Sequence, residues 1–316
     1  MTSRVCIVAT VREPVAIIES FVRYHLAIGV EHLFLFFDDP LDEAIEVARQ
    51  FEQVTAIPSD ELLRERQWRL RSYPGVAKFA HEVMARQILN VETAIELAWK
   101  MRLDWIIHID GDELFYSPTP VAQFFDCVPH AIGQISFRNF EGVPESWDVA
   151  NYFRDVTLFK RHDQLLPPSW PHDYRLFRSR ENYLLGYGNG KSAARVVPEL
   201  LPSGVHCFST TTAHPQRIDC PGSPVILHYI NCGFDAYLRK YQRLGSDSWL
   251  GLPIPFKFYL DSRRLTGNTL ALTDLYQHEV LLDDSDEKEY LLGKRILGRI
   301  TLPSELLTGN SLAFQK

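Results

Sequence analysis

The stretch Trp105-Ile106-Ile107-His108-Ile109-Asp110-Gly111-Asp112-Glu113 decides the fold. Its first five residues are almost wholly apolar, which is typical of a strand buried on both faces of a parallel sheet. Its last four residues place three carboxylates around one glycine. Open α/β sheets bind their ligands at the carboxyl ends of such strands. We therefore expect an α/β protein with a ligand site at residues 110–113.

The chain before this stretch predicts an alternation of strands and helices. Continuous apolar runs indicate buried strands, and apolar residues spaced three and four apart indicate amphipathic helices. The expected strands are residues 5–9, 32–37 and 54–57, and the expected helices run from Pro14 to Gly29 and from Leu41 to Phe51. Strands that alternate with helices in this way predict right-handed βαβ units.

The remaining segments predict a mixed central sheet with helices on both faces. A long helix over residues 78–102 leads directly into the strand at 105–109. Further expected elements are strands at 134–140, 191–197 and 225–229 and a helix at 234–244. We expect one domain over residues 1–245 and a helical C-terminal extension over residues 246–316 that packs on it.

Composition and charge exclude several classes of protein. Of the 316 residues, 46% are apolar and 23% are charged, which is ordinary for a folded soluble domain. The net charge is −7 with histidine neutral, so we expect no nucleic-acid partner. No apolar run is long enough to span a bilayer, and no leader pattern opens the chain, so we expect no transmembrane segment and a cytoplasmic location. The five cysteines lack a Cys-x-x-Cys pair, which favours reduced thiols.

Asp110 and Asp112 are the strongest candidates for a functional site. Two carboxylates one residue apart at the end of a buried strand repel each other, and a divalent cation relieves that repulsion. Mg²⁺ and Mn²⁺ prefer oxygen ligands and often share them with the phosphates of a substrate. Gly111 lets the backbone approach a phosphate closely. The competing interpretation is that the two aspartates only cap a following helix.

Several ordered blocks of the sequence resemble the GT-A glycosyltransferases, particularly glycosyltransferase family 92 and related family 2-like enzymes. The blocks are Arg12-Glu13, residues 19–32 with Tyr24-His25 and Gly29-Val30, residues 34–39, residues 104–115, Lys191 to Arg195, His206, and His228-Tyr229. The resemblance covers roughly residues 4–245 and is densest in the first 116. It implies a GT-A fold, Rossmann-like, over residues 1–245. It also implies a nucleotide-sugar donor, with a UDP-sugar favoured, Mn²⁺ or Mg²⁺, and a glycan or other hydroxyl acceptor.

The resemblance also assigns roles to individual residues. Donor and cofactor contacts fall on Arg12, Glu13, Asp39, Asp110, Lys191 and Arg195, and metal contacts on Asp110, Asp112 and His228. Where relatives continue the acidic loop at residue 39 with Gly, Ser, Thr and Asp, this chain has Pro40-Leu41-Asp42-Glu43. Lys191 and Arg195 lie four apart, so on a strand they face one side and can neutralise a diphosphate, or they form a solvated basic face. The alternative for His228 is a strand-end histidine bonded to backbone.

Inverting sugar transfer needs a carboxylate that takes the proton of the acceptor hydroxyl. The candidates are Glu141, Glu145, Asp148 and Asp173. We favour Glu145, because its loop from Gly142 to Trp147 carries an aromatic residue that can stack on a sugar, and we rank Asp173 next. The competing interpretation for each is an exposed loop acid.

Two other groups of residues have structural alternatives. His206, Cys207, Cys220, His228 and Cys232 lie close in sequence but lack the paired spacing of a zinc site. Arg64, Arg66, Arg69 and Arg71 beside Trp68 indicate acceptor or polyanion contact, or a solvated helix face.

The sequence therefore predicts a metal-dependent, inverting glycosyltransferase. The alternatives are a nucleotidyltransferase that uses the same carboxylate pair, which the absence of a Gly-rich loop near the first strand disfavours, and a noncatalytic module that binds sugar nucleotides or glycans.

Overall fold

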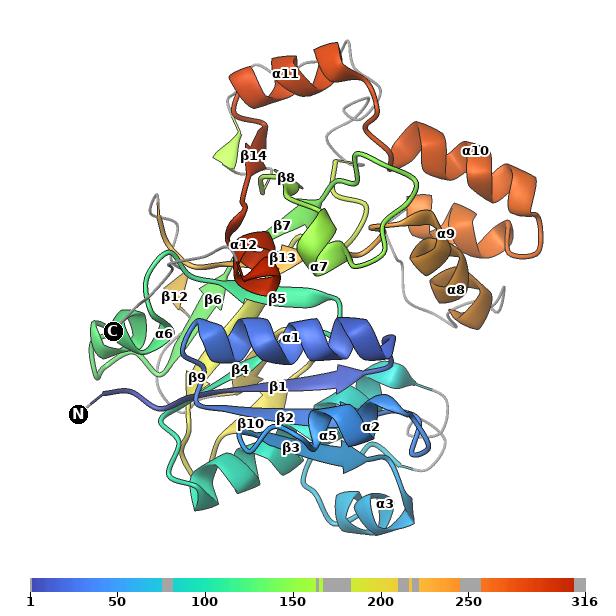
Figure 1. Cartoon of the computed structure of the whole chain (residues 1–316). Coiled ribbons are helices and arrows are strands. Elements are labelled where there is room, and N and C mark those ends of the chain that lie inside the picture. The colour runs from blue at the N-terminus through green and yellow to red at the C-terminus, as the bar shows by residue number, and fades with distance from the viewer. Residues whose placement is uncertain are drawn as a thin grey trace. The chain divides into compact units, whose positions relative to one another are not determined.

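The computed structural model describes residues 2–75, 82–162, 165–166, 183–209, 216–217, 222–244 and 257–309. The chain divides into two compact units (Figure 1). Unit 1 contains Met1–Arg138 and Asn189–Ile226, and unit 2 contains Asn139–Gly188 and Leu227–Ser311. The units therefore do not follow the boundary predicted near residue 245, because the chain leaves unit 1 after Arg138 and returns to it at Asn189.

Unit 1 is built on a seven-stranded mixed sheet with the order β12-β6-β9-β4-β1-β2-β3. Its strands are β1 (Val5–Val11), β2 (His32–Phe37), β3 (Val54–Pro58), β4 (Trp105–His108), β6 (Gln134–Phe137), β9 (Lys191–Arg195) and β12 (Gln216–Arg217). Strands β1 to β4 run parallel, and β9 runs antiparallel to β4 and β6. The remaining elements are β5 (Glu113–Tyr116), β10 (Leu201–Ser203), β11 (Cys207–Ser209), α1 (Val15–Ala27), α2 (Ala44–Ala48), α3 (Glu61–Gln67), α5 (Val83–Lys100) and α6 (Val121–Asp126).

Both faces of the central strands are buried, as their continuous apolar sequences predicted. Alternate residues of a strand point to opposite faces. Cys6 and Val8 pack with Val91 and Ile95 of α5 on one face. The residues between them, such as Ile7, are also fully buried on the other face, which α1 crosses (Figure 1). The predicted mixed α/β fold with helices on both faces is therefore confirmed.

Unit 2 carries a smaller sheet and most of the C-terminal helices. Its strands lie in the order β14 (Leu297–Arg299), β8 (Leu158–Lys160), β7 (Asn139–Gly142) and β13 (Val225–His228). Its helices are α7 (Tyr152–Asp155), α8 (Phe234–Leu244), α9 (Lys257–Arg264), α10 (Thr269–Glu279), α11 (Ser285–Gly293) and α12 (Leu302–Thr308). One apolar cluster includes Val143, Leu158 and Leu297, and a second is rich in tyrosines from α8 and α10.

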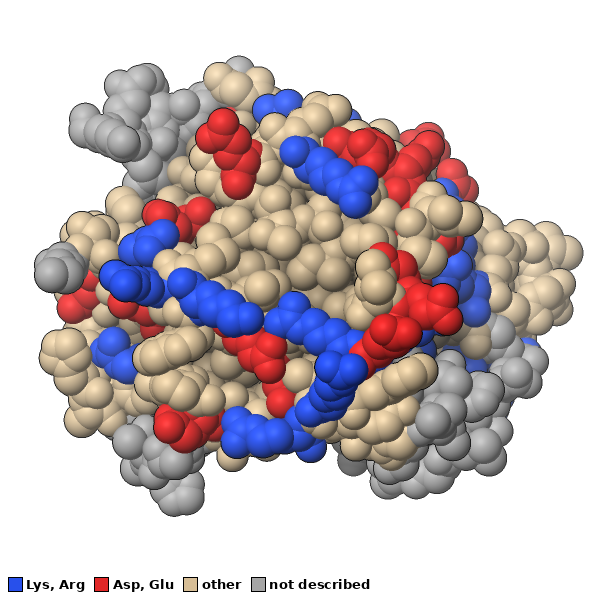
Figure 2. Space-filling model, turned by 90° about the horizontal axis from the view of Figure 1, so that it is seen from below, with Lys and Arg blue, Asp and Glu red and all other residues tan. Residues whose placement is uncertain are grey.

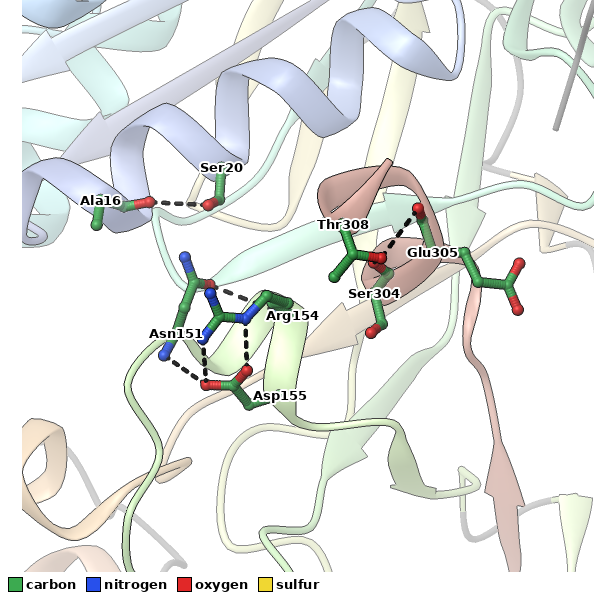
Figure 3. A network of polar contacts seen from close by, with 8 residues as sticks. All are labelled: Ala16, Ser20, Asn151, Arg154, Asp155, Ser304, Glu305 and Thr308. Carbon is green, nitrogen blue, oxygen red and sulfur yellow. Dashed lines mark hydrogen bonds and ion pairs between the residues drawn. The ribbon is translucent and has the colours of Figure 1, made fainter. Parts of the chain in front are cut away.

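Short helices in unit 2 are held by local polar contacts (Figure 3). In α7, Asn151 caps the helix by accepting from the Arg154 backbone N–H, and Arg154 Nε lies 2.7 Å from Asp155 Oδ1. In α12, Thr308 Oγ1 donates to the Ser304 carbonyl at 2.8 Å. Helix α7 packs on α12. These bonds stabilise helices that are too short to be stable alone.

Three predicted elements differ from the structure. The expected strand at 134–140 is two strands, β6 and β7, because the chain passes from unit 1 to unit 2 at Arg138. The expected helix at 41–51 is reduced to α2, Ala44–Ala48. The expected helix at 78–102 is α5, Val83–Lys100, and its first residues lie outside the described part of the chain. Within that part, no helix has the length and apolar character needed to cross a bilayer.

Candidate functional site at the carboxyl edge of the sheet

The parallel strands bring the predicted donor-binding segments to one edge of the sheet. Strand register pairs Val8 with His108 and Val11 with Phe37, so the turns that follow β1, β2 and β4 share this edge. A side-chain carbon at Gly111 would lie 3.3 Å from Val11 Cγ1 and 3.5 Å from Glu13 Cγ. Glu13 is thus next to the Asp110–Glu113 turn, and the preceding Arg12 is exposed, while the donor contacts of both residues stay a prediction.

Lys191 is paired with the carboxylates of this turn. Because β9 runs antiparallel to β4 with Ile107 opposite Ala193, Lys191 begins β9 where β4 ends. Its Nζ donates to Asp110 Oδ2 at 2.7 Å and to the Val205 carbonyl at 3.3 Å. Its distance to Glu113 Oε2 is 3.8 Å, and its side chain is 0% exposed. The structure therefore brings Lys191 to Asp110, inside the sheet rather than on a solvated face.

The other partners of the turn hold its carboxylates in place. Gln87 Nε2 donates to Asp110 Oδ1 at 2.8 Å, so both oxygens of this carboxylate accept hydrogen bonds. The backbone N–H of Asp110 donates to Glu113 Oε2 at 2.8 Å. Gln87 lies on α5, and only its place in the first turns of the helix that precedes β4 could have identified it from sequence.

Burial sets the protonation states at this edge. Burial raises the pKa of Glu113 well above its usual range, and Lys191 offsets this only in part. Burial alone would lower the pKa of Lys191, but Asp110 and Glu113 raise it, so the side chain stays an ammonium. Burial, aided by Lys191, lowers the pKa of His108 to about 3, so its imidazole is neutral near pH 7. The charged pair of the turn is thus Asp110 with Lys191.

Arg195 is placed at the opposite end of β9, away from the carboxylate turn. Its backbone pairs with Trp105 at the start of β4, and its guanidinium lies 4.4 Å from the centre of the Trp105 ring. The guanidinium donates to the carbonyls of Ile132 and Val128, both at 3.0 Å. The expectation that Lys191 and Arg195 act together on one diphosphate is wrong, because four residues of strand separate them by about 13 Å along β9.

The acidic loop after β2 uses its two aspartates differently. Asp39 Oδ1 accepts from the Leu41 backbone N–H at 3.0 Å and closes a local turn. Asp38 is held by Arg86 of α5, with Nε 2.8 Å from Oδ1 and Nη2 3.1 Å from Oδ2. Sequence analysis singled out Asp39 and missed the Asp38–Arg86 pair. Only the position of Arg86 next to Gln87 on the long helix could have indicated it.

The predicted general bases lie in unit 2 or outside the described residues. Glu145 is 2.9 Å from Lys288 Nζ and 3.1 Å from Arg299 Nη1. Burial alone would raise its pKa, but hydrogen bonds from Arg299 and Lys288 lower it overall. A carboxylate held by two cations is a poor proton acceptor, so these contacts weigh against the predicted role. Asp173 lies outside the described part of the chain.

The two other acids considered as bases have structural surroundings. Glu141 is buried, with Oε1 2.9 Å from Lys160 Nζ and Oε2 accepting from the Gly186 backbone N–H. Asp148 is exposed, and its backbone N–H donates to Ser146 Oγ. The geometry of unit 2 therefore singles out no base among them.

His228 ends β13 and belongs to unit 2, whereas Asp110 and Asp112 belong to unit 1. Its side chain is buried, and its ring centre lies 4.8 Å from that of Tyr187. Its metal role stays a prediction. In unit 1, His206 Nδ1 lies 2.8 Å from the Gly190 carbonyl oxygen, and Cys220, which was considered with it as a zinc ligand, is outside the described residues.

The described residues gather no metal-ligand set. No group of three or more His, Cys, Asp and Glu side chains in the ranges that the structure describes could hold a metal ion. Among the described cysteines, Cys6, Cys127 and Cys207 carry free thiols.

The arginines near α3 contribute to a charged surface. Arg66 Nη2 lies 2.6 Å from Glu96 Oε2, and the Trp68 side chain is 53% exposed. Figure 2 shows a band of Lys and Arg side chains with Asp and Glu side chains along it. The Arg66 pair follows the solvated-face interpretation of this segment.

Fold and site together define an α/β protein with a lysine-paired Asp-Gly-Asp turn at the carboxyl edge of a mixed sheet. No family model matches the chain. Two proteins of Arabidopsis thaliana, both named glycosyltransferase-like, are 29% and 28% identical to it over 96% of its length. The chain spans 72% of the first and 63% of the second, which is less than two thirds of the latter.

The predicted resemblance to glycosyltransferases is confirmed at this level, that of a glycosyltransferase-like protein. A solved structure of glucosyl-3-phosphoglycerate synthase from Mycobacterium tuberculosis, in complex with Mn²⁺, UDP and glucosyl-3-phosphoglycerate, is 15% identical. That alignment covers 61% of this chain and 57% of the synthase, with a TM-score of 0.28. A TM-score this low supports no transfer of function from the synthase.

Proposed function

We propose that this protein is a glycosyltransferase that binds a nucleotide-sugar donor at the carboxyl edge of the unit 1 sheet. The observation that carries the proposal is the convergence of the Asp110–Glu113 turn with the ends of β1 and β2. Gly111 lies against Val11 and Glu13, so the backbone of the turn is close to the first strand. Open α/β sheets bind nucleotides at this edge. The glycosyltransferase-like names of two relatives over 96% of the chain add support.

UDP is the nucleotide that we propose, with a glycan or other hydroxyl compound as the acceptor and inversion at the sugar carbon. The resemblance of the sequence blocks to family 92 supports these finer assignments. The reaction forms a bond from the acceptor oxygen to the anomeric carbon and breaks the bond from that carbon to the diphosphate. A carboxylate takes the hydroxyl proton. Asp173 remains the proposed base, since the contacts of Glu145 weigh against it.

The divalent ion implied by the resemblance does not fit the side chains around Asp110. Both oxygens of this carboxylate are engaged, one by Gln87 and the other by the ammonium of Lys191. The described residues supply no third acidic, histidine or cysteine ligand. We therefore assign no step of the reaction to a metal.

Release of UDP from a panel of UDP-sugars and GDP-sugars, in the presence and absence of simple hydroxyl acceptors, tests the proposal. We expect hydrolysis or transfer with one UDP-sugar. Asp112→Asn should weaken UDP binding by at least about tenfold in calorimetry, because a carboxylate accepts a hydrogen bond from a ribose hydroxyl more strongly than an amide does, without a metal. Glu52→Gln is the matched control, because Glu52 is an exposed acid of the same unit.

The outcomes separate the competing functions. Release of pyrophosphate from a nucleoside triphosphate would identify a nucleotidyltransferase. Binding of a UDP-sugar without any turnover would favour a noncatalytic module. Equal UDP affinity in wild type and Asp112→Asn would remove the donor site from this edge.

A further inference from the structure

We propose that the ammonium of Lys191 is the resident cation of Asp110 and that this carboxylate ligates no divalent metal, with or without the donor. The inference rests on the proposed function only for the choice of UDP as a probe. It removes Asp110 as a ligand of the metal that the sequence predicted.

Lys191 already contacts the Asp110 oxygen that would ligate a metal. Its Nζ lies 2.7 Å from Asp110 Oδ2. A divalent ion ligated by this carboxylate would sit about 2.1–2.5 Å from an oxygen, in direct repulsion with the ammonium. The other oxygen accepts a hydrogen bond from Gln87, which donates and cannot ligate through its amide nitrogen.

The Lys191 side chain is held in its position beside Asp110. Its side chain is 0% exposed, and it lies in β9, which is paired on both sides by β4 and β6. Its Nζ is also anchored to the Val205 carbonyl. The preceding Gly190 has a φ of 72°, and a side-chain carbon there would lie 1.9 Å from the Phe137 carbonyl oxygen. The backbone that carries Lys191 is therefore fixed against its neighbour.

Glu113 is a second acid near the ammonium, 3.8 Å from Lys191 Nζ. Its side chain is fully buried, and Oε2 accepts from the Asp110 backbone N–H. Within the described part of the chain, Oε1 has no hydrogen-bond partner. An enclosed carboxyl with one oxygen turned toward the backbone completes a packed network around Lys191 and is not an open ligand for a hydrated ion.

Titration of the full chain with Mn²⁺ tests the inference directly. The EPR signal of free Mn²⁺ decreases as the ion binds to the protein and so measures the binding. We expect Asp110→Asn to remove no Mn²⁺ binding from the protein, because wild type has no Mn²⁺ site that includes Asp110. Lys191→Met removes the ammonium and keeps a side chain of similar size. This variant should bind Mn²⁺ at least about tenfold more tightly than wild type does. Lys100→Met is the matched control, because Lys100 is an exposed lysine of unit 1 and should change nothing. Should Lys191→Met fail to fold, wild type and Asp110→Asn decide the question alone.

Calorimetry with UDP supplies the second arm. In wild type we expect the same UDP affinity in EDTA and in excess Mn²⁺, within about twofold. A wild-type Mn²⁺ site that Asp110→Asn removes, or UDP binding that needs Mn²⁺ and Asp110, would overturn the inference. If UDP binds under neither condition, the proposed function fails, and the Mn²⁺ titration still tests the role of Lys191.

Discussion

At the scale of the single residue, the two cationic partners of Glu145 indicate a structural role for its side chain. It lies in the loop after β7 and contacts Lys288 of α11 and Arg299 of β14. We expect Glu145→Gln to lower the free energy of unfolding by about 1 kcal/mol, because half-exposed ion pairs are weak, and to leave UDP affinity unchanged. Thermal or urea unfolding measures the loss. Glu289→Gln is the control, since Glu289 is an exposed acid of the same helix as Lys288.

A catalytic base would give a different pattern for the same substitution. Transfer would be abolished while the melting temperature stayed constant, and that result would restore Glu145 to the role that the sequence predicted. The prediction failed to foresee the pairing because Lys288 and Arg299 follow Glu145 by more than 140 positions, and no local pattern links such distant residues.

The pH dependence of Glu145 provides a further prediction. Its pKa is lowered in the folded state by Arg299 and Lys288. The stability that it contributes is therefore present above the unfolded value of about 4.3 and is lost as pH falls through the folded pKa. We expect the difference in unfolding free energy between wild type and Glu145→Gln to shrink between pH 7 and about pH 3. A difference that stays constant over this range would indicate a packing effect instead.

Gly190 determines, at the scale of the element, where β9 begins. Gly190 and Gly204 have nearly the same φ, 72° and 70°, but of the two only Gly190 has a close neighbour, the Phe137 carbonyl. Replacing either glycine by alanine costs about 1–2 kcal/mol for the left-handed conformation. We expect Gly190→Ala to cost at least about 2 kcal/mol more, because overpacking is added.

Urea unfolding of the two variants measures this difference. Gly190→Ala should also weaken UDP binding, since it displaces Lys191, whereas Gly204→Ala should bind UDP as wild type does. Equal losses of stability would mean that β9 and β6 adjust without strain.

Elements that bury both faces were predictable because one rule governs them. The runs at residues 5–9, 32–37 and 105–109 form β1, β2 and β4, and the helix at 234–244 is α8 as expected. The run at 134–140 is also extended, but it forms two strands where one was predicted. The chain changes unit at Arg138, and the hydrophobic pattern contains no signal of that change. Lys191 was found and Arg195 misplaced for a related reason: side-chain direction follows from sequence spacing, but strand pairing does not.

At the scale of the whole molecule, the main feature is the path of the chain between the two units. The chain passes between the units after residues 138, 188 and 226. Strand β9, which carries Lys191, lies between β4 and β6 although more than 50 residues of chain separate it from β6. The sheet of unit 1 is therefore incomplete until residue 217 has been placed, and pairing over such separations slows folding. No stretch of linker composition marks these crossings, so the sequence predicted a continuous domain over residues 1–245 followed by a C-terminal extension.

The division into units makes a prediction about where a bound nucleotide stabilises the chain. If UDP binds at the carboxyl edge of unit 1, amides of β1, β4 and β9 should exchange more slowly with solvent. At a UDP concentration of 100 times Kd, the slowest amides of unit 1 should gain about 2.7 kcal/mol of protection. Amides of α10 and α11 in unit 2 should change by less than about twofold, because they report on separate opening. Hydrogen exchange followed by mass spectrometry, with and without UDP, measures both sets in one sample. Protection confined to α10 and α11 would place the nucleotide in unit 2, and equal protection of both sets would mean that the units open together as one cooperative structure.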